Sequence, residues 1–211
     1  EGPQGGSTLA NASPFATATQ TTGGTTGGSG TVVAGATPYM TPVIPGYPAP
    51  NVISAQEQQL LQQVPAQYGQ AESKVIMVSL DGQYIQAIQN GKLVLWTYVI
   101  TGRAALSTPT GFYSIFYKDS PLTFFPASTD PKSPYFGFPS KVQYGMEFLQ
   151  GGFFIHDTWW HSIYAVSYTF WHYDPGRLEN QEGSHGCVNT PLHAMVFLFQ
   201  WAPMNTPVIV F

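Results

Sequence analysis

The chain has 211 residues, of which 43% are hydrophobic and only 9% are charged, and this length fits one ordinary domain together with a tail. Its net charge of −4 comes from 11 acidic residues and 7 basic residues, and the basic residues are scattered singly. Phosphate binding needs clustered Lys and Arg, so the composition argues against a nucleic-acid-binding role. No apolar run approaches the ~18 residues of a membrane helix, and we expect no membrane span.

Residues 1–52 form a Gly/Thr/Pro-rich tail of low complexity that has no charged residue after Glu1. A Gly/Thr run over 21–28 is followed by regularly placed prolines, which predicts an extended linker or stalk. The alternative is an assembly element that adds a strand to a second copy or wraps it, giving a homo-oligomer. The chain begins with Glu1 instead of Met, and a cleaved signal peptide is one explanation.

Residues 53–72 are predicted to be a short helix and a connector. Ser54 and Glu57 have the spacing of a capping box, in which each side chain binds the backbone N–H of the other residue. Leu60, Leu61 and Val64 follow at helical spacing. The pattern predicts a helix over 54–64, ended by Pro65.

Residues 73–211 have the alternation of strands and turns that is typical of a mostly β domain. Asp81-Gly82 and Asn90-Gly91 predict two hairpin turns. Thr190 and Pro191 resemble an N-cap and a first helical residue, so a helix is expected to run from there to about Trp201. Strands are expected at 75–80, 84–88, 93–101, 112–117, 142–149, 153–156 and 207–211. Residues 118–140 have many prolines and aromatics but no period, and we expect them to form a long excursion or flap.

Cys187 is the only cysteine, so no intramolecular disulfide can form. A buried core thiol is the plain interpretation. A cysteine nucleophile, in contrast, needs a nearby base or cation that lowers its pKa from ~8.5, and backbone N–H donors for an oxyanion. Gly186 allows the sharp turn that presents such donors. His156, at the end of an apolar strand, is the candidate base.

The segment Ser184-His185-Gly186-Cys187-Val188-Asn189, preceded by a histidine on a strand, resembles the signature of the L,D-transpeptidase catalytic domain, the YkuD-type family. The hairpins at 79–85 and 90–94, the Thr-Pro turn at 108–113 and the last strand at 206–210 are also similar to that family. The resemblance covers residues 73–211 in the correct order. It implies an L,D-transpeptidase-like β sandwich or barrel with one or two short helices.

The resemblance implies a role for each residue of the motif. Cys187 is the acylated nucleophile and His156 its base, while the backbone carbonyl of Asp157 is the third member of the triad. The N–H groups around Gly186 and Cys187 form the oxyanion hole. The side chains expected to shape the site and to orient substrate are those of Ser184, His185 and Asn189.

Three assignments near this motif remain open. The stretch between His156 and Ser184 is longer than is usual in the family and is rich in aromatics, so His172 is an alternative base. Trp159 follows His156 closely and belongs either to the core or to a wall that stacks on substrate. Arg103 either receives a substrate carboxylate or lies on the surface.

No cofactor and no metal are expected. The spacing from His156 to His161 matches no common zinc motif, and the sequence has no HExxH or CxxC. His161 and His193 are interpreted as structural. A thiolate and oxyanion donors suffice for acyl transfer.

The implied function is peptidoglycan cross-linking. Cys187 would attack a tetrapeptide stem, and a second stem would accept the acyl group to give a 3–3 cross-link. With water as acceptor the protein would be an L,D-carboxypeptidase. This chemistry implies a secreted or cell-envelope location. The alternative is a structural surface or filament-forming protein built on a transpeptidase-like domain. A papain-like or NlpC-type peptidase is disfavoured, because there the nucleophile precedes the base.

Overall fold

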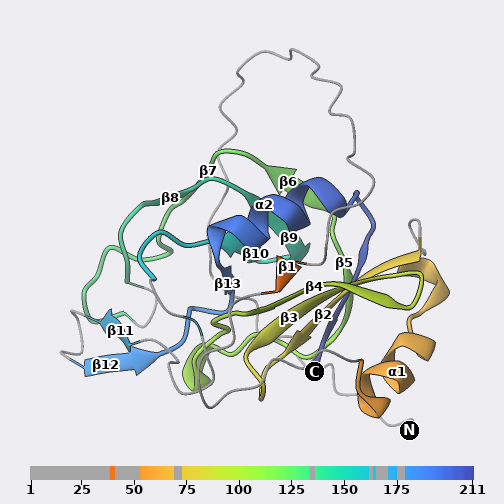
Figure 1. Cartoon of the computed structure of the whole chain (residues 1–211). Coiled ribbons are helices and arrows are strands. Elements are labelled where there is room, and N and C mark those ends of the chain that lie inside the picture. The colour runs from red at the N-terminus through yellow and green to blue at the C-terminus, as the bar shows by residue number, and fades with distance from the viewer. Residues whose placement is uncertain are drawn as a thin grey trace, which may run out of the picture.

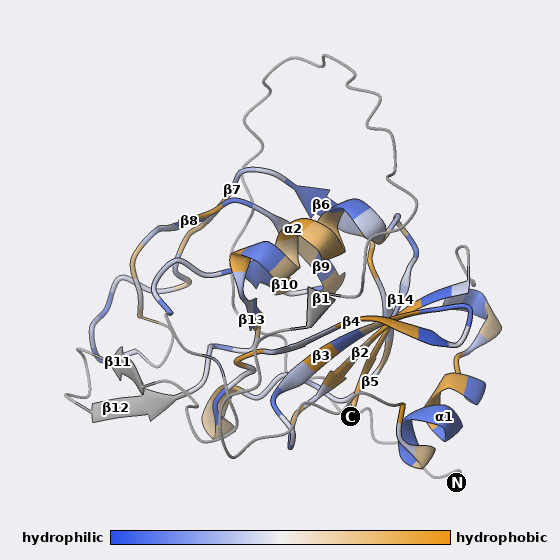
Figure 2. Ribbon diagram, in the orientation of Figure 1, coloured by the Kyte–Doolittle hydropathy of each residue, from blue (hydrophilic) through white to orange (hydrophobic). Residues whose placement is uncertain are grey.

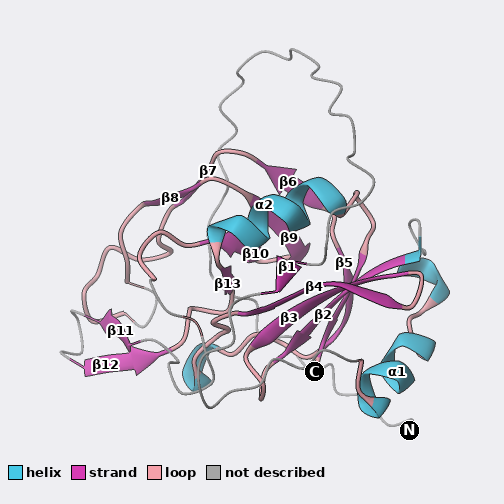
Figure 3. Ribbon diagram, viewed as in Figure 1, coloured by secondary structure: helices cyan, strands magenta, loops and turns pink. Residues whose placement is uncertain are grey.

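The computed structural model describes residues 39–40, 53–68, 73–133, 136–161, 164, 171–174 and 179–211. For 39–40, 171–174 and 179–182 only the backbone is described. The described elements are mainly strands with two α-helices, so the prediction of a mostly β fold is confirmed (Figure 3). The tail lies almost wholly outside the described residues, and its role as linker or assembly element stays a prediction.

The larger sheet has six strands in the order β1-β4-β3-β2-β14-β5. Asn90 and Gly91 join β3 to β4 with φ of 52° and 71°, which confirms the predicted hairpin turn. The last strand, β14, pairs in parallel with β2 and antiparallel with β5. The strands are β1 (Tyr39–Met40), β2 (Lys74–Ser79), β3 (Tyr84–Gln89), β4 (Lys92–Tyr98), β5 (Gly111–Ser114) and β14 (Pro207–Val210).

The second sheet has four strands in the order β13-β10-β9-β6, and it carries His156 and Asn189. β10 and β13 are parallel, and their register sets His156 opposite Asn189. These strands are β6 (Tyr117–Asp119), β9 (Gly145–Leu149), β10 (Phe153–Asp157) and β13 (Val188–Thr190). Two-stranded sheets are formed by β7 (Leu122–Phe124) with β8 (Ser140–Val142), and by β11 (Trp171–Asp174) with β12 (Glu179–Glu182).

The main core lies where both sheets meet α2 (Leu192–Trp201). Figure 1 shows α2 beside β9 and β10, and Figure 2 shows hydrophobic residues along β2 and in the middle of α2. Burial of their apolar surface, at about 25 cal/mol per Å², is the main stabilising term. Fully buried members include Ile76, Ile85, Leu95, Met146, Ile155 and Leu198. The Lys118 ammonium donates to the carbonyl of Ala202 at 2.6 Å, and so ties β6 to the end of α2.

Helix α1 (Ala55–Gln62) covers the other face of the larger sheet. Its predicted capping box is present: Glu57 N donates to Ser54 Oγ at 3.2 Å, and Ser54 N donates to the Glu57 carboxylate at 2.5 Å. Leu60, Leu61 and Val64 pack against the buried residues of β2 and β14. The helix ends two residues before the predicted limit. Within the described part of the chain, no helix has the length and apolar character to cross a membrane.

The structure corrects four predicted boundaries. The strand predicted at 142–149 is divided between β8 and β9, because the Asp157 carboxylate accepts from the N–H groups of Gln143 (3.1 Å) and Tyr144 (2.7 Å). The strand predicted at 112–117 is divided where Ile115 enters the core between the two sheets. The predicted flap at 118–140 includes the end of β6, all of β7 and the first residue of β8. Pro191 is the N-cap of α2 and not its first residue.

Candidate active site

The motif loop is held against the chain that continues from β4. Ile100 and Asn189 exchange two backbone hydrogen bonds of 3.0 and 2.8 Å. At the start of the loop, Ser184 N donates to Thr101 O at 2.8 Å and Arg103 N donates to Ser184 O at 3.0 Å. The loop 184–189 is therefore anchored at both ends, which fixes the position of Cys187 between them.

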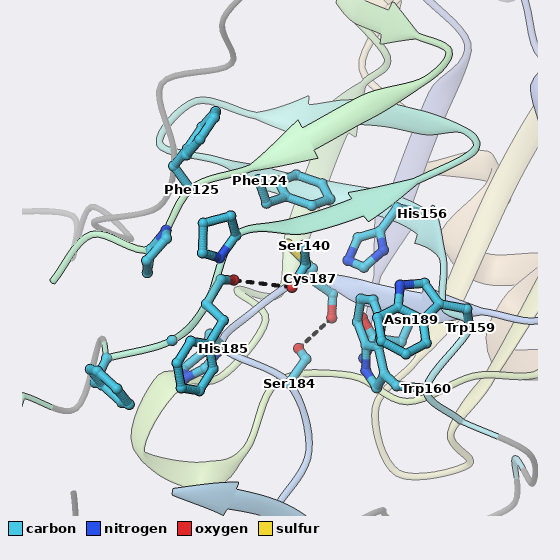
Figure 4. A pocket seen from close by; sticks show the side chains of 15 residues that line it. Phe124, Phe125, Ser140, His156, Trp159, Trp160, Ser184, His185, Cys187 and Asn189 are labelled. Carbon is cyan, nitrogen blue, oxygen red and sulfur yellow. Dashed lines mark hydrogen bonds between the residues drawn. The ribbon is translucent and has the colours of Figure 1, made fainter. Parts of the chain in front are cut away.

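Side-chain hydroxyls fix the middle of the loop. Ser184 Oγ accepts from Gly186 N at 3.0 Å and donates to Cys187 O at 2.6 Å, the latter drawn as a dashed line in Figure 4. Thr108 Oγ1 donates to Gly186 O at 2.9 Å and accepts from Gly102 N at 2.9 Å. Both polar groups of Gly186 are thus bound within the protein. This arrangement leaves the Gly186 N–H committed to Ser184 in the absence of substrate.

Gly186 has a φ of 122°, which side chains rarely tolerate, and a Cβ there would lie 2.8 Å from Phe153 Cε1. We expect Gly186→Ala to destabilise the fold by about 1–3 kcal/mol and to displace Cys187. The measurement is thermal melting together with the rate of covalent labelling at Cys187. Gly91→Ala is the matched control, because φ there is 71° and nothing lies within 4 Å of the added carbon. Labelling at the wild-type rate in Gly186→Ala would contradict this role.

His156 lies on β10 with only 4% of its surface exposed. Its Nδ1 is 2.8 Å from the carbonyl oxygen of Asp157. A carbonyl can only accept, so Nδ1 carries the proton and Nε2 presents a lone pair. Burial lowers the pKa of His156, although the Asp157 carbonyl and charge oppose that shift. His156 therefore has the form of a neutral base.

Asp157 makes its hydrogen bond to this histidine through its backbone carbonyl. Its side chain accepts from the N–H groups of the two residues between β8 and β9, as described above, and the residue is 2% exposed. The carboxylate thus fixes the turn between β8 and β9. Its carbonyl is the group that orients the His156 ring.

Cys187 is partly exposed, and its thiol donates to the carbonyl of Gly152 at 3.3 Å. The side chain also packs beside Leu122 and Phe154. Burial raises the pKa of the Cys187 thiol to about 12; a backbone hydrogen bond from Phe154 lowers it, and the charge of Glu147 raises it further. The surroundings of Cys187 therefore raise the pKa of the thiol instead of lowering it, as a nucleophilic cysteine would need. At neutral pH the Cys187 thiol and the His156 imidazole are both uncharged.

A cleft of about 410 Å³ contains both His156 and Cys187 (Figure 4). One wall comes from the predicted flap, with four phenylalanines, and the opposite wall comes from Trp159 and Trp160. Among the described residues that line it, none is Asp, Glu, Lys or Arg. The structure brings together these predicted site residues: His156, Trp159, Ser184, His185, Cys187 and Asn189. The flap phenylalanines were not predicted as site residues: Phe124, Phe125, Phe136 and Phe138.

Trp159 is 74% exposed at the cleft, so its assignment to the core is wrong. We expect Trp159→Ala to raise KM about 3- to 10-fold, because a ring that contacts substrate would be lost. The free energy of unfolding should change by no more than about 0.5 kcal/mol. Steady-state kinetics and thermal melting check both expectations. Phe116→Ala is the control, since that ring is 39% exposed but does not line the cleft; equal KM changes in both variants would contradict the assignment.

Three other predicted residues are placed as follows. The His161 ring nitrogen Nε2 is 3.2 Å from Asn189 Nδ2, consistent with the structural role expected for it. Arg103 is 4% exposed, so the surface assignment is wrong. His172 belongs to β11, opposite Gln181 of β12, and its side chain is not described. Within the described ranges, no group of three or more His, Cys, Asp or Glu could hold a metal ion.

The family model of the L,D-transpeptidase catalytic domain, YkuD, matches residues 73–210. The chain therefore belongs to this family of acyl-transferring enzymes. No match was found among curated protein sequences.

Solved L,D-transpeptidase structures share this fold. An NMR structure of the catalytic domain from the E. faecium enzyme has 30% identity and a TM-score of 0.51, over 68% of this chain and 100% of that one. A crystal structure of a cysteine-to-serine mutant of the Enterococcus faecium enzyme has 29% identity and a TM-score of 0.51, over 65% of this chain and 49% of that one. The Ldtfm–avibactam carbamoyl enzyme has 30% identity and a TM-score of 0.51, over 66% and 49%. This chain thus spans about half the length of the last two.

Proposed function

We propose that the chain is a peptidoglycan L,D-transpeptidase that forms 3–3 cross-links through an acyl-enzyme on Cys187. The observation that carries the proposal is the shared cleft: His156, with its tautomer set by the Asp157 carbonyl, lines the same cavity as the only cysteine of the chain. This pairing of a base and a nucleophile is what covalent acyl transfer requires. Membership of the family supports the substrate, a peptidoglycan stem peptide.

The first half of the reaction forms the thioester. The Cys187 proton passes to His156 Nε2, and sulfur attacks the carbonyl carbon between the third and fourth residues of the stem. His156 then returns the proton to the leaving nitrogen, and the C–N bond breaks. The terminal D-amino acid leaves with an intact amine, and the stem remains bound to sulfur.

The second half transfers the acyl group. The amine of a second stem attacks the thioester carbonyl, His156 accepts its proton, and the C–S bond breaks. The proton returns to sulfur, and the new amide is the cross-link. No metal or organic cofactor enters these steps. The aromatic walls of the cleft hold the stem, with Trp159 as one contact and Ser184, His185 and Asn189 at the floor.

The oxyanion donor is assigned to the backbone N–H of Cys187. Gly186 N already donates to Ser184 Oγ, so it does not point freely at substrate. Ser184 also holds the Cys187 carbonyl and thereby fixes the residue that carries this donor. One well-placed donor of this kind contributes about 10²- to 10³-fold to the rate. Gly186 then serves the oxyanion hole by shaping the turn.

Product analysis tests the proposal. The protein is incubated with a disaccharide tetrapeptide, and the products are separated and weighed by mass spectrometry. A cross-linked dimer with one released D-amino acid per link is the expected result. Tripeptide with released D-amino acid and no dimer would identify an L,D-carboxypeptidase instead. No product from folded protein would reject acyl transfer to peptidoglycan.

This function places the protein at the cell envelope or outside the cell, where its substrate is. Assembly through the tail is a separate proposal. Light scattering of the full chain and of a chain that starts at Ile53 tests it. A larger mass for the full chain alone is the expected result, and equal monomer masses would reject assembly.

A further inference from the structure

The turn between β9 and β10 meets the nucleophile directly. Gly151 and Gly152 both have positive φ, 100° and 90°, so the turn is a left-handed two-glycine turn. Its last residue offers its carbonyl to the Cys187 thiol at 3.3 Å. A thiol has one proton, and while it is donated to Gly152 it is not donated to His156. Proton transfer to the base therefore requires the thiol to leave this carbonyl.

Glu147 on β9 binds the same turn through its side chain. Its Oε1 accepts from Gly152 N at 3.1 Å. Glu147 is partly buried, pairs in register with Phe154 of β10 and Tyr117 of β6, and carries a charge that acts on the Cys187 thiol. The reaction described above gives this carboxylate no role.

We propose that Glu147 is a positioning residue: its carboxylate holds Gly152, whose carbonyl binds the Cys187 thiol, and its negative charge keeps the nucleophile a neutral thiol until the thiol leaves that carbonyl for substrate. The proposal rests on Cys187 being the nucleophile of the proposed function. It goes further by assigning control of the thiol proton to a residue outside the motif.

Other titratable groups around the thiol do not substitute for Glu147. On β6, Tyr117 donates its hydroxyl to Asp119 at 3.0 Å, and burial raises the pKa of Tyr117 above its ordinary value, so the ring carries no charge at neutral pH. On β10, the Asp157 carboxylate is bound by two backbone N–H groups. His156 is neutral once the pH exceeds its lowered pKa.

The sign of the effect follows from the charges. Near the high pH at which the thiol titrates, Glu147 is ionised, and a negative charge disfavours a nearby thiolate. Removing that charge lowers the pKa of Cys187 and raises the thiolate fraction at any pH below it. A change of half a unit to one unit corresponds to about a 3- to 10-fold faster reaction of the thiol.

The test is the rate at which iodoacetamide, an uncharged probe, alkylates Cys187 as a function of pH. Glu147→Gln keeps an acceptor for Gly152 N but removes the charge. We expect its profile to move to lower pH, with alkylation about 3- to 10-fold faster at neutral pH. Asp81→Asn is the matched control, since it removes one charge from the exposed turn between β2 and β3. We expect the wild-type profile for that variant.

If the midpoint of the alkylation profile is unchanged or higher in folded Glu147→Gln, the proposal is overturned. A glutamate with only a structural role would change the melting temperature and leave this midpoint where it is. If Glu147→Gln does not fold, Glu147→Asp replaces it. The shorter side chain draws the charge back from the Gly152 turn, so a smaller shift in the same direction is expected. An unshifted profile in that variant would again overturn the proposal. Alkylation needs no peptidoglycan, so a shifted profile without cross-linking activity would reject the proposed function, while the effect of Glu147 on the Cys187 proton would stand.

Discussion

Cys187→Ala is expected to lose all acyl transfer, with turnover about 10⁴- to 10⁶-fold below that of the wild type. The reason is that no other cysteine exists in the chain to accept the acyl group. Release of the D-amino acid from a tetrapeptide stem, followed over time, measures the loss.

The loss in Cys187→Ala must be separated from unfolding. Cys187 is partly exposed and only borders the cluster of Leu122, Val142 and Phe154, so the substitution should cost about 1 kcal/mol or less of unfolding free energy. Thermal melting checks that the variant stays folded. Turnover within tenfold of the wild type would show that Cys187 is not the nucleophile.

His156→Gln is expected to slow acylation about 10²- to 10⁴-fold, because the group that accepts the thiol proton is removed. Glutamine is preferred to alanine because the ring packs at 4.8 Å from that of Phe124, and a smaller residue would leave a cavity. His172→Ala is the matched control and should retain full activity. The opposite pattern, with activity lost only in His172→Ala, would assign the base to His172.

The pH dependence of acylation follows from the same histidine. Burial lowers the pKa of His156, so the imidazole stays neutral, and able to accept a proton, to a lower pH than an exposed histidine does. As the pH falls through this lowered pKa, the ring becomes protonated and acylation is lost. We expect the acidic limb of the rate profile to lie below the ordinary value of about 6.5.

The features of the fold that could be predicted from the sequence are those that depend on residues close together in the chain. The Asn90-Gly91 turn and the Ser54–Glu57 capping box depend on residues at most three positions apart, and both are present. The breaks at Ile115 and at 143–144 depend on distant contacts. The second of these needs the Asp157 carboxylate from another strand, and no pattern within 142–149 reveals it.

The candidate site divides in the same way. The motif from Ser184 to Asn189 and the histidine before it could be singled out from sequence, and the structure sets them around one cleft. The phenylalanine wall could not be singled out, because residues 118–140 show no periodicity. The neutral state of the Cys187 thiol also could not be predicted. Both the burial of the thiol and its hydrogen bond to the Gly152 carbonyl depend on how the start of β10 packs against the motif loop.

The central claim is that Cys187 becomes acylated, and intact mass spectrometry tests it most directly. The protein is mixed with a tetrapeptide stem or with a carbapenem, quenched in acid, weighed and digested. The account predicts a mass increase equal to the bound acyl group, located on the peptide that contains Cys187 and absent from Cys187→Ala. Folded wild-type protein that turns over substrate with no adduct on Cys187 would contradict it.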